Sequence, residues 1–227
     1  MKFNKEIVVI KYLMWLILSF PISLLAGEAN QQAVAELTAL LNGVNFINAN
    51  FTQIVTNKSG YLVQEQVGTV QLVKPNLLHW QVLAPDHMLI VTDGNKIWNY
   101  DIDLEQVTIK HFSKEINNTK IANLLFGDIS KTLSNFEVVA LVNKDSDAIQ
   151  KCNAYTCFEL NSNNNSTEED PFVKAVLGFN KNKKLVMLRF YDQLDQETVF
   201  NFSKFRNSVD PKVFKFTVPE DVDVIED

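Results

Sequence analysis

The most constraining feature of this sequence is a series of short runs in which apolar and polar residues alternate, separated by turn signals. In Ile47–Val55 and again in Leu77–Leu83 the apolar residues recur with a period of two, which is typical of strands with one buried face. Asp93-Gly94 stands between two such runs and predicts a tight hairpin, because both turn positions tolerate positive φ. Further predicted strands include Val213–Val218 near the C-terminal end.

Helical periodicity is confined to two places. Gln31–Leu41 carries an apolar stripe at helical spacing, and Asn42-Gly43 then supplies a stop. Glu115–Ser134 breaks the alternation and predicts one or two short helices, with Asn118-Thr119 as a candidate N-cap. About ten or eleven strands in mostly sequential hairpins, with few helices, predict a mainly β chain whose antiparallel sheet is too wide to stay flat.

Residues 1–26 have the layout of a secretory signal peptide. Three lysines precede an apolar run of 14 residues, Tyr12–Leu25, and small residues follow, so cleavage is expected after Ala26 or Ala29. The run is shorter than the roughly 20 residues that span a bilayer, although an uncleaved anchor is the alternative interpretation. We expect residues 27–227 to form a single domain.

Charge excludes one class of partner. The chain has a formal net charge of −6, and removing residues 1–26 leaves −8. An acidic body has no broad attraction for nucleic acids or anionic membrane surfaces, so we expect no nucleic-acid partner.

The two cysteines, Cys152 and Cys157, predict a disulfide at a hairpin end after export to an oxidising compartment. We expect no metal site, because His79, His87 and His111 stand singly and far from them. The sequence contains none of the GxSxG, HExxH, GxGxxG or GxxxxGK[ST] motifs, and we predict neither catalysis nor a cofactor.

Hydrophobic side chains exceed what one helix and a short helical insert can cover. Sixteen of the residues are Phe, and many of them fall on predicted strands. The sheet therefore either closes on itself and fills, or curves around an apolar cavity.

Several segments together resemble the outer-membrane lipoprotein carrier protein (LolA) family of Gram-negative bacteria. The resemblance covers essentially the whole of residues 27–227. It rests on Ala49–Gln53, Lys74–Trp80, Ala84–Asp86, Val91–Tyr100, Glu105–Val107, Phe214–Pro219 and Val222–Ile225. KPNLLHW and DGNKIWNY are the most specific of these when taken together.

The resemblance implies an open, incomplete antiparallel β-barrel with a helical lid over an apolar cavity. It implies a periplasmic monomer that accepts acylated lipoproteins from an inner-membrane ABC transporter and delivers them to an outer-membrane lipoprotein receptor. The receptor shares the fold but is itself acylated at an N-terminal Cys, which this sequence lacks.

The resemblance also assigns roles to residues. The expected cavity residues are Phe51, Leu78, Trp80, Trp98 and Phe136, and the expected lid residues are Ile121, Leu124, Leu125 and Phe126. Lys74 takes the position of a family Arg that latches the lid by bonding backbone carbonyls, and Lys has no planar fork for several carbonyls at once. An exposed charge before a turn is the alternative for Lys74, and an ordinary core position is the alternative for Leu78.

Two other functions fit the same residues. A half-barrel of this kind could carry a different amphiphile, such as a free lipid or glycolipid. It could also have a filled core and act as an interaction or sensor module.

Overall fold

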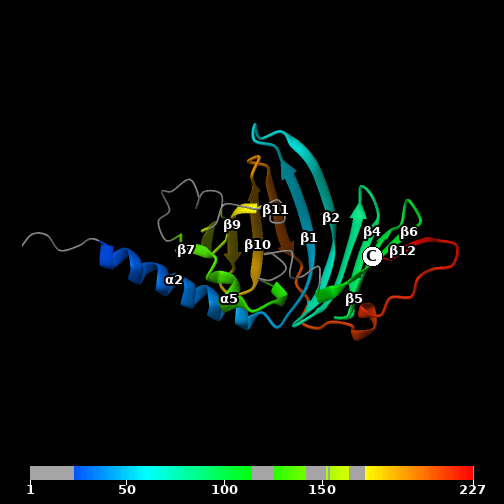
Figure 1. The fold of residues 1–227 in the computed structure, drawn as a ribbon, viewed down its shortest axis with the longest axis horizontal. Coiled ribbons are helices and arrows are strands. Elements are labelled where there is room, and N and C mark those ends of the chain that lie inside the picture. The colour runs from blue at the N-terminus through cyan, green and yellow to red at the C-terminus, as the bar shows by residue number, and fades with distance from the viewer. Residues whose placement is uncertain (1–22, 114–124, 142–151, 153, 164–171, 227) are drawn as a thin grey trace, which may run out of the picture.

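A single curved sheet dominates the computed structural model, which describes residues 23–113, 125–141, 152, 154–163 and 172–226 (Figure 1). Twelve strands of this part of the chain belong to the sheet, against the ten or eleven predicted. The strands are β1 (Phe46–Thr56), β2 (Leu62–Val73), β3 (Leu77–Ala84), β4 (Met88–Thr92), β5 (Lys96–Asp101), β6 (Gln106–His111), β7 (Phe136–Ala140), β8 (Thr156–Ser162), β9 (Phe172–Phe179), β10 (Leu185–Asp192), β11 (Glu197–Ser203) and β12 (Asp223–Glu226). The helical elements are α2 (Ser23–Gly43), α5 (Ile129–Leu133) and the 3₁₀ turn η1 (Pro211–Phe214). The predicted mainly β class is confirmed.

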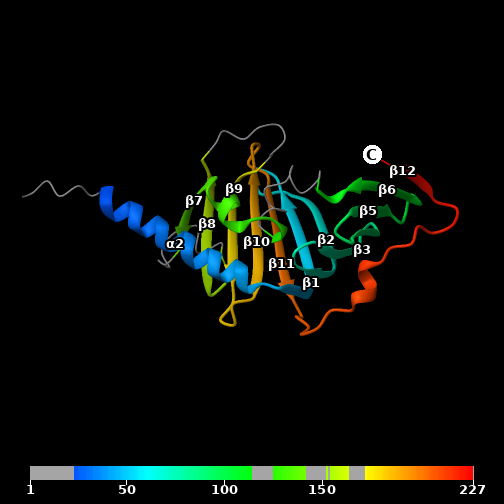
Figure 2. The same ribbon diagram turned by 60° about the horizontal axis from the view of Figure 1, so that its bottom comes forward.

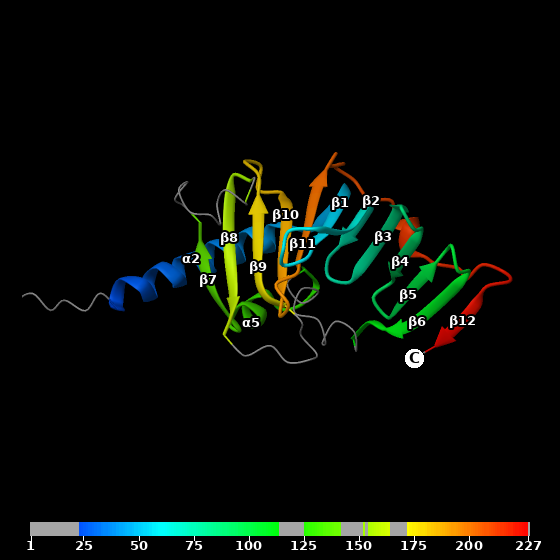
Figure 3. The same cartoon turned by 90° about the horizontal axis from the view of Figure 1, so that it is seen from above.

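The sheet consists of two hairpin meanders joined by its first long strand. The strand order is β12-β6-β5-β4-β3-β2-β1-β11-β10-β9-β8-β7, and Figure 3 shows it running from β7 to β12. Every pairing is antiparallel except that of β12 with β6. The sheet is open, because β7 and β12 lie at its two ends and do not pair with each other.

The predicted turn signals produce the hairpins. Gly94 has a φ of +91°, and the backbone N–H groups of Asn95 and Lys96 both donate to Asp93 Oδ1, at 2.8 and 3.0 Å. Asp93-Gly94 thereby sets the register of β4 with β5, in which Val91 lies opposite Trp98. Local turn chemistry therefore decides which face of the sheet each β5 side chain occupies.

Helix α2 covers the concave face of one half of the sheet, as Figure 2 shows. Leu37 and Leu41 are fully buried and share one hydrophobic cluster with side chains of β1 and of β7–β11. The helix contains the predicted span and begins earlier, at Ser23. No helix in the described ranges is long and apolar enough to cross a membrane.

Helix α5 lies within the segment predicted to be helical and closes the same cluster. Asp128 caps it by accepting a hydrogen bond from Lys131 N at 3.1 Å, and Ile129 and Leu133 are buried. Asn118-Thr119, the N-cap candidate, lies outside the described residues.

The strand predicted over Val213–Val218 is wrong. Asp210 and Pro211 start the 3₁₀ turn η1, and the chain continues without regular structure until β12. Phe214 is buried and Phe216 half-buried, so their alternation reflects packing of this segment against the sheet beside β3 and β4. The last strand comes later and is parallel to β6.

Candidate functional site

Aromatic rings from four strands meet on the concave face of the sheet. Phe51 on β1 stacks on Trp80 of β3 with ring centroids 3.9 Å apart. Trp80 meets the edge of Phe200 on β11 at 5.5 Å, and Phe200 meets Phe190 on β10 at 6.1 Å. We call these four residues the aromatic cluster.

Strand register explains how these rings reach one another. Phe51 lies opposite Gly68 on the intervening strand β2, and Gly68 lies opposite Val82. A Cβ at position 68 would lie 2.7 Å from the Phe51 ring, so glycine is what lets this ring extend across β2 toward Trp80. The cluster therefore depends on one missing side chain.

The four side chains of the aromatic cluster differ in their exposure to solvent. Phe51 is 2% exposed and Phe190 is buried, whereas Trp80 and Phe200 are only partly buried, as are Leu78 and Met88 beside them. The cluster thus forms the border between a filled core and apolar surface that is still available. Such a surface can bind hydrocarbon by burial and dispersion, without any polar chemistry.

Phe136, another predicted cavity residue, lies deeper in the core. It is 4% exposed on β7, and it lines a shallow cavity of about 580 Å³ between α2 and α5, together with Val34 and Leu133. Phe136 belongs to the same hydrophobic cluster as Phe51 and Phe190, which it joins from β7.

The structure places Trp98 on the face opposite the predicted cavity. Trp98 lies across from Val91, which lies across from His79, whereas Trp80 is the next residue along β3 and points the other way. Its ring packs 6.0 Å from that of Phe216 in the C-terminal segment. The assignment of Trp98 to the cavity is corrected on this ground.

His79 is also on this outer face and is partly buried there. Its Nδ1 is inaccessible to solvent and makes no hydrogen bond within the described part of the chain. Burial lowers the pKa of His79 below its ordinary value of 6.5, because desolvation disfavours the charged imidazolium.

Two of the four predicted lid residues are described. Leu125 and Phe126 are partly buried and pack against the core, and Phe126 meets the edge of Phe112 at 6.0 Å. Ile121 and Leu124 lie outside the described residues.

Lys74 connects the sheet to helix α2. Its Nζ donates to the backbone carbonyl oxygen of Leu41 at 2.7 Å, and its backbone N–H donates to Asn45 O at 3.0 Å. Burial lowers the pKa of the Lys74 ammonium from its ordinary value. A cation at this position also complements the negative end of the helix dipole.

Cys152 and Cys157 form a disulfide on the convex side of the sheet. The two sulfurs pack against Val176 and Met187, whose side chains point away from the concave face. A Cβ on Gly178 would lie 3.2 Å from Cys152 Sγ, so the glycine makes room for the bridge. The disulfide is remote from the aromatic cluster.

The described residues contain no group of three or more His, Cys, Asp or Glu side chains that could hold a metal ion.

Comparison with known proteins identifies the family. The family described as "Outer membrane lipoprotein carrier protein LolA" matches residues 42–217. The chain belongs to the LolA family. The outer-membrane lipoprotein carrier protein of Hahella chejuensis is 34% identical over 199 residues, covering 87% of this chain and 90% of that protein. The protein of the same name from Pseudomonas paraeruginosa is 34% identical over 205 residues, covering 89% and 92%.

Solved structures agree with the fold. The crystal structure of an uncharacterized conserved protein from Thermus thermophilus has a TM-score of 0.51 at 11% identity. The match covers 86% of this LolA-family chain and 99% of that protein. The likeness at this identity concerns the fold alone.

Sequence reasoning missed part of the site of this LolA-family protein. Phe190 and Phe200 complete the aromatic cluster, although the sequence places them only among the excess rings. The alternation along β11 is the signal that could have found Phe200. The pairing of β11 with β1 cannot be predicted from any local pattern.

Proposed function

We propose that this protein is a periplasmic chaperone that binds the acyl chains of lipoproteins released from the inner membrane and transfers them to an outer-membrane lipoprotein receptor. An ABC transporter of the inner membrane supplies the cargo in this proposal. Its curated relatives carry the name outer-membrane lipoprotein carrier protein, which supports the assignment.

The observation that carries the proposal is the half-buried border of the aromatic cluster. Trp80 and Phe200 present apolar surface that the protein's own side chains leave partly uncovered. An acyl chain gains about 0.8 kcal/mol for each methylene it buries, so even partial burial against these rings competes with aggregation in water.

Release requires that the binding surface can be covered again. Leu125 and Phe126 pack against the same core as Trp80, and Lys74 fixes the end of α2 to the sheet. In this proposal these contacts close the empty protein and open when cargo enters, so the cost of opening lowers the net affinity for lipid. A receptor with a slightly better cavity can then take the cargo without an energy source.

Export to the periplasm fits the N-terminal sequence. Cleavage after Ala26 would shorten α2 at its beginning but leave the buried residues Ala33, Leu37 and Leu41 in place. The mass of the exported chain tests this assignment, and a mass that includes residues 1–26 would contradict it.

The experiment that tests the proposal is lipoprotein release from spheroplasts. The purified protein is added, and lipoproteins in the soluble fraction are measured for the natural chain and for Trp80→Ala. We expect about tenfold less release with Trp80→Ala, because burial of a large apolar side chain is worth about 1.5–3 kcal/mol.

The matched control is Trp98→Ala, which removes the same ring from the opposite face. It should leave release close to that of the natural chain once folding of both variants is verified by circular dichroism. Release that does not depend on Trp80, or that falls equally with Trp98→Ala, would contradict the proposal.

A further inference from the structure

The face that β1 turns toward the core is apolar except at one position. Strand alternation places Ile47, Ala49, Phe51, Gln53 and Val55 on the concave face. The four apolar side chains are 0–6% exposed, whereas Gln53 is only partly buried. Gln53 is therefore the one polar side chain that β1, all of which the structure describes, presents on this face.

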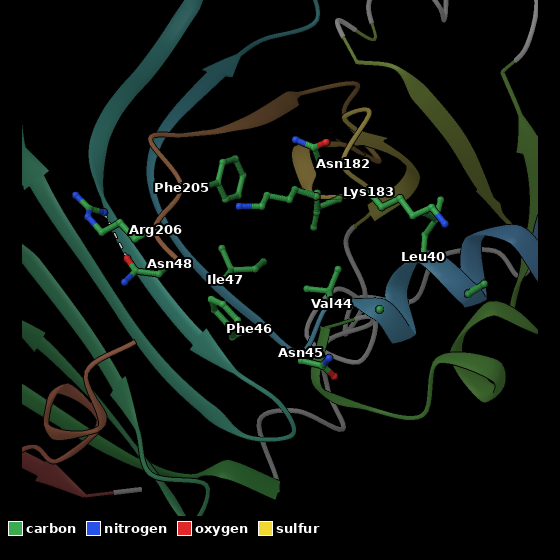
Figure 4. Close-up of a pocket in the computed structure, with 14 residues that line it drawn as sticks. Leu40, Val44, Asn45, Phe46, Ile47, Asn48, Asn182, Lys183, Phe205 and Arg206 are labelled. Atoms are coloured by element: carbon green, nitrogen blue, oxygen red, sulfur yellow. Dashed lines mark hydrogen bonds between the residues drawn. The ribbon is translucent and has the colours of Figure 1, made fainter. Parts of the chain in front are cut away.

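Gln53 also lies on a particular side of the aromatic cluster. Toward the start of β1, Ile47 lines a cavity of about 320 Å³ together with Val44 and Phe205 (Figure 4). In the opposite direction, toward the turn between β1 and β2, the next residue after Phe51 on the same face is Gln53. An amide is therefore placed on the side of the cluster that faces this turn.

A second glutamine lies beside Gln53. In the register of the sheet, Gln53 is opposite Gln66 on β2 and opposite Phe200 on β11. Side chains in such opposite positions have Cβ atoms about 4.5–5.5 Å apart, so the two glutamines are neighbours and Gln53 adjoins a ring of the aromatic cluster. Both glutamines are partly buried, and neither side chain hydrogen-bonds to another described residue.

No charged side chain shares this surface on β1, β2 or β11, three strands that are described over their whole length. β1 contains no charged residue, and the only ones in β2 and β11 are Glu65 and Glu197. Glu65 lies opposite Ile54 and Glu197 opposite Thr56, so both alternate to the convex face. The polar groups that these strands place beside the cluster are therefore uncharged.

An uncharged amide suits the polar end of an acyl chain. Each acyl chain ends in an ester or amide carbonyl, whose oxygen accepts a hydrogen bond and carries no charge. The side-chain NH₂ of glutamine has two donors for such an oxygen. A few well-placed polar groups beside an apolar surface are what fix the orientation of a ligand.

We propose that Gln53 and Gln66 determine specificity by donating hydrogen bonds to the carbonyl oxygens of the bound acyl chains. The hydrocarbon then lies on Trp80 and Phe200, and the carbonyl ends point toward the turn between β1 and β2. This inference rests on the carrier function proposed above, and it adds the chemical group that is recognised and the orientation of the cargo.

The test compares two short cysteinyl lipopeptides that differ only in how their chains are attached to glycerol. One carries ester-linked octanoyl chains, and the other carries ether-linked octyl chains, which have no carbonyl oxygen. Calorimetric titration of the purified protein should show about tenfold tighter binding of the ester lipopeptide. In Gln53→Leu/Gln66→Leu this preference should disappear, because the ester lipopeptide loses affinity while the ether lipopeptide binds at least as tightly as before.

Gln81→Leu is the matched control. Gln81 is also a partly buried strand glutamine, but it lies on the convex face, opposite Thr69 and Leu89. The control should keep the ester preference, and binding of the ether lipopeptide shows that each variant is folded. Equal binding of the two lipopeptides by the natural chain, or an ester preference that survives in Gln53→Leu/Gln66→Leu, would overturn the inference. Loss of the preference in Gln81→Leu as well would also overturn it.

The same titrations separate this inference from the carrier proposal. Trp80→Ala should weaken binding of both lipopeptides about equally. Binding that depends on Trp80 but shows no ester preference would contradict the role of the two glutamines alone and would still support the carrier proposal. Absence of binding of either lipopeptide to the natural chain would contradict both.

Discussion

Gly68 has no side chain, and this is what allows the Phe51 ring to extend across β2 and stack on Trp80. A Cβ at this position would overlap the backbone carbonyl oxygen of Gln81 and approach the Phe51 ring to 2.7 Å. Gly68→Ala should therefore lower the free energy of unfolding by about 1–3 kcal/mol, because a packed core accommodates an extra carbon poorly. Urea unfolding measures this.

Gly43 provides the matched control for that substitution. It ends helix α2, and a Cβ built there meets no atom within 4 Å. Gly43→Ala should change the free energy of unfolding by less than about 0.5 kcal/mol. Equal losses at the two positions would argue against close packing of the Phe51 ring on β2.

The burial of His79 predicts that the stability of the protein depends on pH. Because burial lowers its pKa in the folded state, the folded protein binds fewer protons at this site than the unfolded chain. The free energy of unfolding should therefore fall as the pH drops below about 6.5, and His79→Gln should reduce that fall. Urea titrations at pH 5.5 and 7.5 test this, with the exposed His111→Gln as control. An unchanged pH dependence in His79→Gln would contradict the assignment.

The Lys74 side chain holds the C-terminal end of helix α2 in place. Its bond to Leu41 O holds the C-terminal end of α2 against the sheet, and Lys74→Met keeps most of the apolar stem while removing that bond. We expect backbone amides in the last turn of α2 to exchange with solvent about tenfold faster, since one such bond is worth roughly 1–1.5 kcal/mol. Hydrogen exchange measured by NMR checks this.

The control for Lys74→Met is Lys212→Met on the exposed turn η1, which should leave exchange in α2 unchanged. Under the carrier proposal, easier opening should also lengthen cargo retention by Lys74→Met. Unchanged exchange at the end of α2 would remove Lys74 from the closing mechanism.

The face that a side chain occupies was predictable from the sequence in strands where one face is clearly more apolar than the other. The alternation in β1 and β3 predicted which residues of each strand share a face, and in the structure Phe51 and Trp80 both lie on the face that carries the core cluster. In β5 the neighbours Ile97 and Trp98 are both apolar, so alternation does not choose a face, and only the register of the hairpin does. The predicted strand Val213–Val218 failed for a different reason. Phe214 and Phe216 have the two-residue spacing of a strand, but their segment is not part of the sheet, and Phe216 packs against Trp98 on its outer face.

The pairing that assembles the whole molecule lies beyond local pattern. β1 joins β11, which brings together residues about 150 positions apart, such as Phe51 and Phe202. This pairing makes one sheet of two meanders and places Phe200 beside Trp80. Sequence periodicity predicted the number and type of strands well, but it contains no information about which meander edges meet.

The central claim is that acyl chains bind the concave face and not the convex one, and the two tryptophans allow a direct measurement. Removal of residues 1–26 also removes Trp15, so each single-tryptophan chain reports one face: Trp98→Phe keeps Trp80, and Trp80→Phe keeps Trp98. Each is loaded with a lipoprotein whose acyl chains carry bromine, which quenches indole fluorescence on contact. Binding on the concave face should quench Trp80 strongly and leave Trp98 unquenched. Equal quenching of both, or quenching of Trp98 alone, would contradict binding on that face.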